Sequence, residues 1–84
     1  MPRSVPPPAW VLTRRRATGD RIRTARQVAG LTQEQVALRI DMDRATYNRI
    51  EQGHSSPLLD SLIRIADAIG VDLADLVRTD PPAT

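Results

Sequence analysis

The stretch from residue 31 to residue 53 constrains the fold most, because its pattern is typical of two short helices joined by a tight turn. Thr32 and Asp43 are residue types that cap helix N-termini, so we expect helices over residues 33–40 and 44–52. Helices of this length are not stable alone in water and need other elements to pack against. The rest of the chain is therefore expected to supply a helical scaffold.

The flanking segments carry the apolar periodicity of further helices. Residues 18–28, 58–69 and 72–77 place apolar side chains three and four positions apart, which predicts one buried face on each helix. Aromatic residues make up only 2% of the chain, and β-branched residues are scattered, so no strand is expected. The sequence predicts an all-α fold, a compact five-helix bundle. The buried face of the fourth helix is expected to consist of Leu59, Leu62, Ile65, Ala66 and Ile69.

Composition excludes several classes of function. The chain contains no cysteine and a single histidine, His54, so neither a disulfide nor a metal site is expected. It contains no phosphate-cradling glycine loop and no nucleophile–base pair, so we expect no cofactor and no enzymatic activity. It also lacks the apolar run of ~20 residues that a membrane span needs, and it shows no signal peptide. A cytoplasmic protein with no membrane contact is expected.

The charge of the chain is unevenly distributed. Residues 1–26 carry seven arginines and one acid, which gives +6, whereas residues 27–84 carry five arginines and nine acids, which gives −4. Such an asymmetry indicates an anionic partner on the basic side. We expect Arg14, Arg15 and Arg16 to contact phosphate groups; the alternative is that they form a solvated helix face.

The prolines suggest the domain boundaries. Residues 1–9 hold four of the seven prolines, and we expect residues 1–16 to form a flexible Pro- and Arg-rich N-terminal arm. An added helical turn leading into the first helix is the alternative for the second half of this arm. Residues 17–78 would form the single domain, and residues 79–84 a disordered tail. Trp10 is expected to pack on the domain or on a partner chain.

Arg26 falls on the inward side of the helix expected over residues 18–28, with Ile22 and Ala25. A buried charge without a partner is costly. Glu51, on the inward side of the helix over residues 44–52, is the expected partner of Arg26. We therefore expect a structural ion pair between the two helices.

Four segments of the sequence resemble the phage repressor and Cro-type (XRE) family of helix-turn-helix regulators. They read IRTAR, GLTQEQVA, RATYNRIEQG and LIRIADAIGVDLADL, and they cover about residues 19–77 without a gap. The resemblance implies a lambda-repressor-like bundle that binds double-stranded DNA as a homodimer, on an inverted repeat with half-sites about one helical turn apart. The family usually has glycine where Asp41 stands, since that residue takes a positive φ.

The outer face of the helix over residues 44–52 is the expected DNA-reading surface. A helix fits the major groove of DNA, and an arginine can donate two hydrogen bonds to one guanine. The expected base-reading residues are Arg44, Ala45, Asn48 and Arg49. The expected contacts with the DNA backbone, besides the three arginines of the arm, are Gln33, Thr46, Gln52 and His54.

A homodimer interface is expected beside the last helix. Leu76 is expected to serve the core of its own chain, while Leu73 or Val77 faces a partner, together with Leu58. The alternative is that all of these side chains pack internally in a monomer.

Two functions remain open from the sequence. The first is a sequence-specific DNA-binding transcriptional regulator, most simply a repressor. The second is an antitoxin or another protein-interaction module on the same fold, which would contact a partner protein through its acidic C-terminal half and Trp10. The outward direction expected for Arg44 and Arg49 favours the first function.

Overall fold

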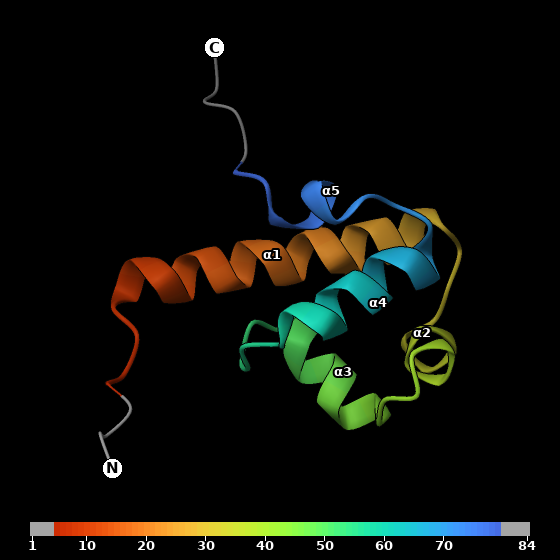
Figure 1. The fold of residues 1–84 in the computed structure, drawn as a ribbon, viewed down its shortest axis with the longest axis horizontal. Helices are drawn as coiled ribbons and strands as arrows, with labels where there is room; N and C mark the ends of the chain where they lie inside the picture. Colours follow the sequence, from red (N-terminus) through yellow and green to blue (C-terminus); the bar gives the residue numbers. More distant parts are fainter. Residues whose placement is uncertain (1–4, 80–84) are drawn as a thin grey trace.

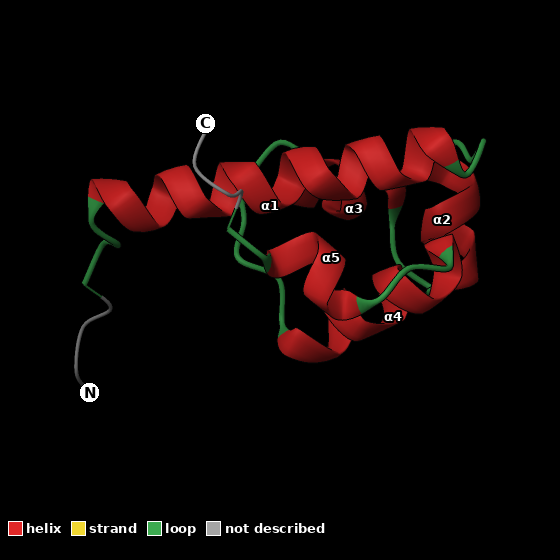
Figure 2. Cartoon of the chain, turned by 90° about the horizontal axis from the view of Figure 1, so that it is seen from above, coloured by secondary structure: helices red, strands yellow, loops and turns green. Residues whose placement is uncertain are grey.

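The computed structural model describes residues 5–79, which form five helices and no strand. α1 is the longest helix; α3, α4 and α5 pack against it, and α2 packs against α3 and α4 (Figures 1 and 2). The predicted all-α, five-helix fold is confirmed. No helix within residues 5–79 is both long and apolar enough to cross a membrane. The helices are α1 (Ala9–Val28), α2 (Gln33–Arg39), α3 (Arg44–Glu51), α4 (Leu59–Ile69) and α5 (Leu73–Val77).

The apolar side chains of all five helices meet in one core. Tyr47 from α3 and Ile65 from α4 are fully buried, and the short α5 contributes Leu76. Because every helix supplies at least one buried residue, none of the short helices depends on its own stability. The core consists of Ile22, Val36, Ala37, Ile40, Tyr47, Ile50, Ile65, Ala66, Ile69 and Leu76.

The two short central helices begin where the sequence predicted. The Thr32 hydroxyl accepts a hydrogen bond from the Gln35 N–H, and the Gln35 side chain accepts one from the Thr32 N–H, so α2 starts with a capping box. At the start of α3, the Asp43 carboxylate accepts a hydrogen bond from the Thr46 N–H at 3.2 Å. Both caps satisfy backbone N–H groups that lack partners within the helix.

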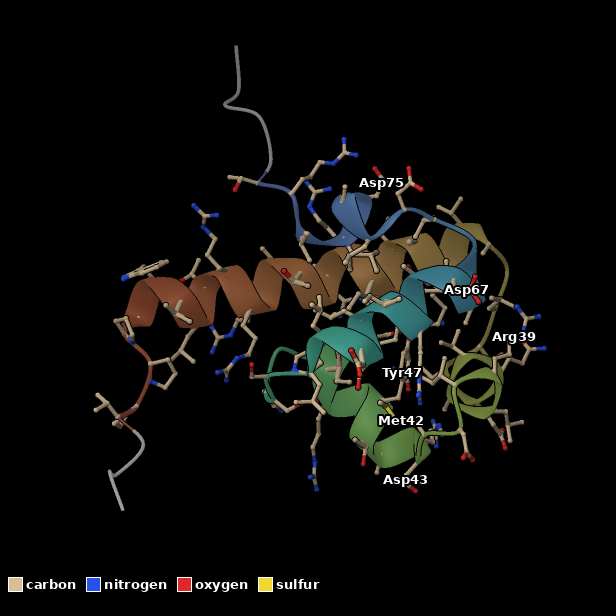
Figure 3. All side chains as sticks on the ribbon, in the orientation of Figure 1. Arg39, Met42, Asp43, Tyr47, Asp67 and Asp75 are labelled. Carbon is tan, nitrogen blue, oxygen red and sulfur yellow. The ribbon has the colours of Figure 1, made fainter. Side chains whose placement is uncertain are left out.

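The turn between α2 and α3 contains an aspartate in a left-handed conformation. Asp41 has a φ of 53°, which aspartate tolerates better than most residues. The Met42 N–H then donates to the Ala37 carbonyl at 2.9 Å, which turns the chain back. Met42 packs against the core beside the amino-terminal end of α3 (Figure 3). The turn therefore forms without the glycine that the resembled family uses.

The start of α1 differs from the sequence prediction. The helix begins at Ala9, so the expectation of a flexible arm is wrong for residues 9–16, which are helical. A proline disfavours helical backbone in the residue before it, and Pro8, the last of three consecutive prolines, is the N-cap. The residues after it contain no helix breaker, so the helix extends back to this proline. Residues 1–4 and 80–84 lie outside the described part of the chain, which includes only Thr79 of the expected tail.

One position of α4 also differs from the prediction. Leu62, Ile65 and Ile69 contact the core, whereas Leu59 is 62% exposed. The helical repeat of 3.6 residues turns Leu59 by roughly 60° from Leu62. Leu59 therefore lies at the edge of the buried face, in the first turn of the helix, and it points outward.

Gly19 allows α1 and α3 to pack backbone against backbone. A Cβ atom at this position would lie 2.4 Å from the Glu51 carbonyl oxygen and 2.7 Å from the Ile50 carbonyl oxygen. Both oxygens belong to the backbone, so a methyl group at residue 19 would require the two helices to separate. The carboxyl-terminal end of α3 therefore rests directly on α1.

We expect Gly19→Ala to destabilise the protein. Alanine favours a helix over glycine by about 0.5–1 kcal/mol, but the added methyl group would overlap two carbonyl oxygens, and such overpacking typically costs about 1–3 kcal/mol. Urea unfolding should show a net loss of about 1–2 kcal/mol. Thr24→Ala, an exposed change on the same helix, is the control and should not lower the stability. A Gly19→Ala protein as stable as the original would contradict the close approach of α1 and α3.

Candidate nucleic-acid interface

α3 has one buried face and one exposed face. The buried face consists of Tyr47, Ile50 and Glu51. The opposite face is polar, apart from one alanine, and is accessible to a large partner. Five of the residues expected to contact DNA lie exposed on it or at its end, namely Arg44, Ala45, Thr46, Arg49 and Gln52.

An ion pair holds the buried face of α3 against α1. Arg26 Nε donates a hydrogen bond to Glu51 Oε2 at 2.7 Å, and Arg26 Nη2 donates to Glu51 Oε1 at 3.0 Å. The Glu51 side chain is 1% exposed and the Arg26 side chain 12%. The planar guanidinium meets the carboxylate at two points, which fixes the relative orientation of the two side chains.

Three further groups complete a network around the Glu51 carboxylate. The Tyr47 hydroxyl donates to Glu51 Oε2, and Gln33 Nε2 donates to Glu51 Oε1 at 3.1 Å. Arg26 Nη1 donates to the Leu31 carbonyl at 2.9 Å. The network therefore joins α1, α2 and α3, and no buried side-chain nitrogen or oxygen within residues 5–79 lacks a hydrogen-bond partner.

The network keeps Glu51 ionised. Burial alone would raise the pKa of its carboxyl, but the hydrogen bonds donated by Arg26, Tyr47 and Gln33 outweigh burial and hold this pKa below its usual range. The hydrogen bond to Glu51 raises the pKa of Arg26, although burial opposes it. Burial, followed by the hydrogen bond to Glu51, raises the pKa of Tyr47. The Tyr47 hydroxyl therefore keeps its proton and remains a donor.

Gln33 and Asn48 contact each other. Gln33 Nε2 donates to Asn48 Oδ1 at 2.9 Å, and both side chains are half-buried. The sequence assigned Gln33 to the DNA backbone and Asn48 to a base. In the structure their contact connects the amino-terminal end of α2 to the middle of α3, so the Asn48 oxygen is engaged within the protein.

Arg44 and Arg49 carry the positive charge of the exposed face. Neither has a hydrogen-bond or ion-pair partner within residues 5–79. Five residues separate them, which is roughly 7.5 Å along the helix axis, or about two base-pair steps of DNA at ~3.4 Å each. Ala45, which is exposed on the same helix, has a short side chain that does not project as far as the two arginines.

The three consecutive arginines of α1 have different contacts. Arg14 Nη1 donates to Thr79 Oγ1 at 2.7 Å, on the side of α1 that faces α5. Arg15 is half-buried and, like Arg14, lines a pocket with Pro57 and Leu62. Arg16 packs over Gly53, where a Cβ atom would lie 2.7 Å from Arg16 Cγ. Arg16 therefore lies against the turn that ends α3, whereas Arg14 does not.

The other residues predicted to contact DNA or a second copy lie outside the network around Glu51. His54 is exposed in the turn that follows α3. Leu58 is 75% exposed and Val77 is 47% exposed, whereas Leu73 packs partly against the core. Leu76 is fully buried, as expected. Within residues 5–79, no group of three or more acidic, histidine or cysteine side chains is placed to hold a metal ion.

Sequence reasoning missed two partners of Glu51. Tyr47 precedes Glu51 by four residues on one helix, a spacing that places side chains next to each other, so this contact had a local signal. The contact of Gln33 with Glu51 depends on how α2 crosses α3, which no local pattern reveals. The close approach at Gly19 is hidden in the same way.

Comparison with known proteins agrees with this geometry. The helix-turn-helix family matches residues 22–76, more than half of the chain. The fold is similar to that of the restriction-modification controller protein C.AhdI from Aeromonas hydrophila, with a TM-score of 0.74 and 26% identity, over 77% of this chain and 94% of that chain. No curated protein sequence is significantly similar to this chain.

Two further solved structures share the fold. The clp gene regulator ClgR from C. glutamicum matches with a TM-score of 0.72 and 24% identity, over 75% of this chain and 82% of that chain. The hypothetical transcription factor NHTF from Neisseria also matches with a TM-score of 0.72 and 24% identity, over 93% of this chain and 86% of that chain.

α2 and α3 lie within the segment that matches the helix-turn-helix family. The chain belongs to the helix-turn-helix family, and within it to the repressor and Cro type. This is a family of DNA-binding regulators, not of enzymes. The chain is accordingly a DNA-binding regulator of transcription.

We expect Arg26→Met to destabilise the fold strongly. The substitution keeps an apolar stem but leaves the buried Glu51 carboxylate without its cation, a change that typically costs about 3–5 kcal/mol. Arg23→Met on the same helix is the control, because Arg23 forms an exposed pair with Asp20 and such pairs contribute about 0–1 kcal/mol. Equal free energies of unfolding for the two variants would contradict the role of the network.

We also expect the network to be lost in acid. The folded state lowers the pKa of Glu51, so its contribution is complete above the unfolded-state pKa of about 4.3 and disappears as the pH falls through the folded-state value. The free energy of unfolding, measured in urea between pH 7 and pH 3, should fall more steeply for the original protein than for Glu51→Gln. Parallel pH profiles would show that Glu51 titrates alike in the folded and unfolded states.

Proposed function

We propose that this protein represses transcription by binding as a homodimer to an inverted repeat in double-stranded DNA, with α3 in the major groove. The observation that carries the proposal is the exposed face of α3, where Arg44 and Arg49 have no partner within residues 5–79. An outward, unpaired guanidinium is free to donate to an external acceptor. The buried network on the opposite face supports the proposal, because it sets the orientation of this helix.

The base-reading roles follow from the position of each side chain. Arg44 and Arg49 would each donate two hydrogen bonds to the O6 and N7 atoms of a guanine. Ala45, which is small, would allow close approach and contact a thymine methyl group. Asn48 has its oxygen held by Gln33, so its amide nitrogen is the group directed to adenine or to a phosphate.

Contacts with the DNA backbone are assigned to the residues around α3. Gln33 lies at the amino-terminal end of α2, and Thr46, Gln52 and His54 are exposed beside α3. Residues 31–53 carry three arginines and four acids, a net charge of −1. Since phosphate neutralisation provides most non-specific affinity, a basic residue from outside this stretch is needed. We assign this role to Arg16, because it packs over Gly53 at the end of α3.

Dimerisation and repression complete the proposal. One copy of α3 spans only a few base pairs, and a two-fold dimer doubles the contacts on an inverted repeat. Exposed Leu58 and Val77 support an interface beside α5. Repression requires only that the bound dimer occlude a promoter, which a DNA-binding bundle achieves without an activating surface.

If Arg44 and Arg49 read bases, replacing either one should reduce the preference of the protein for its own DNA site over random DNA. With the inverted repeat selected from random DNA as the probe, Arg44→Ala or Arg49→Ala should each cost ~1–3 kcal/mol in binding. Random DNA should lose much less affinity, so the ratio of the two Kd values should fall. Arg64→Ala, an exposed change on α4, is the control and should leave this ratio unchanged. If either variant lost the same affinity for both DNAs, the residue would not read bases.

The backbone assignment distinguishes two arginines of α1. Arg16→Ala should weaken binding to all DNA sequences. It should also reduce the slope of log K against log salt concentration by about 0.9 for each phosphate that is no longer neutralised, hence about 1.8 for a dimer. Arg23→Ala is the matched control, because Arg23 lies further along α1 and forms an exposed pair with Asp20. Equal slopes for Arg16→Ala and the original protein would show that Arg16 does not contact phosphate.

A further inference from the structure

The amino-terminal half of α1 projects beyond the rest of the bundle, as both views show (Figures 1 and 2). We name residues 9–17 the stem. The stem begins with an exposed aromatic side chain: Trp10 is 67% exposed, and Leu12 is 37% exposed. Trp10 is also the single tryptophan of the chain. A large aromatic residue held out in water on a rigid helix, away from its own core, needs a partner to bury it.

An apolar surface lies where the stem leaves the bundle. A pocket of about 230 Å³ opens between the stem and the other helices, and Val11, Pro57, Leu62 and Val77 are among its lining residues. Further exposed apolar side chains flank it on α4. Leu58 precedes Leu62 by one helical turn, and Leu59 precedes Ile63 by the same spacing, so each pair shares a side of α4. We name the exposed members of this surface the apolar patch: Leu58, Leu59, Ile63 and Val77, which are 75%, 62%, 47% and 47% exposed.

The stem and the apolar patch are complementary in charge. The stem carries three arginines and no acid, hence +3. Of the acids in α4 and α5, Asp67 lines a pocket with Arg39 and Asp75 is paired with Arg78, so neither belongs to the patch. Asp60 is exposed beside Leu59 in the first turn of α4. The patch therefore offers one exposed carboxylate, that of Asp60, to a basic stem.

We propose that the stem packs against the apolar patch of a second copy of this chain, with Trp10 as the anchor of the contact. A two-fold axis makes such a contact reciprocal, so each copy donates one stem and receives another. Every contact is then made twice, and a buried tryptophan contributes about 150–250 Å² on each side. The inference rests on the dimer of the proposed function and assigns the element that forms it.

The occupant of the patch is a second copy rather than the stem of the same chain. The stem is one continuous helix with the rest of α1, and Trp10 remains exposed in that arrangement. A stem from another copy can lie across the start of α4, where Arg14 or Arg15 can approach Asp60. Two stems side by side would instead bring six arginines together and repel each other.

The test combines the mass of the protein with the fluorescence of its single tryptophan. The full chain is measured over a concentration series by sedimentation equilibrium, and Trp10 emission and its quenching by iodide are recorded on the same samples. We expect the emission to shift to shorter wavelength and the quenching to fall with the same midpoint as dimer formation. Trp10→Ala should raise the dimer Kd by at least about tenfold, as for anchors of this type.

Matched variants control for changes elsewhere on the surface. Leu38→Ala removes an exposed apolar side chain from α2 (74% exposed) and should leave the dimer Kd unchanged. Asp60→Lys should weaken the dimer. Asp67→Lys should not, because Asp67 lies on the side of α4 near Arg39 (Figure 3).

The outcomes separate this inference from the proposed function. A dimer whose Trp10 emission does not change with concentration, and which Trp10→Ala leaves intact, would overturn the role of the stem and leave a DNA-binding dimer of another kind. A chain that stays monomeric both free and on DNA would overturn both. Emission that is already at short wavelength in the monomer would show that Trp10 packs on its own chain, and would also overturn the inference.

Discussion

The buried contact between Arg26 and Glu51 is the interaction on which the rest of the structure depends. It joins α1 to α3, and Gln33 brings α2 to the same carboxylate. A two-point ion pair has a direction, so it specifies how α3 is rotated about its own axis as well as where it lies. The face that carries Glu51 is turned inward, and the face that carries Arg49 is therefore turned to solvent.

A buried ion pair of this kind contributes little net stability relative to an apolar core of the same shape. Its value here is geometric, because α2 and α3 are too short to keep their orientation unaided. Gly19 also helps to fix the position of α3, because the absence of a side chain lets the last turn of α3 rest on the backbone of α1. Together, the network and the close approach hold a two-turn helix in a fixed position.

Local sequence signals predicted the elements that depend on local chemistry. The caps at Thr32 and Asp43 set the starts of α2 and α3, and the inward position of Arg26 implied an acidic partner. Helical structure before residue 17 was expected only as the alternative to a flexible arm, because prolines followed by an arginine run have the composition of an arm, although the helix begins immediately after Pro8. The exposure of Leu59 and the contact of Gln33 with Asn48 depend on how helices cross, which periodicity along one helix does not encode.

The central claim is that the outer face of α3 reads guanines in the major groove. The most direct measurement is binding to the DNA site selected from a random library, compared with the same site in which 7-deazaguanine replaces guanine in each half-site. This replacement removes the N7 acceptor, which lies in the major groove, and leaves base pairing intact. We expect an inverted repeat that contains guanine and an affinity lower by about tenfold or more after the replacement. Unchanged affinity, or a selected site without guanine, would contradict the claim.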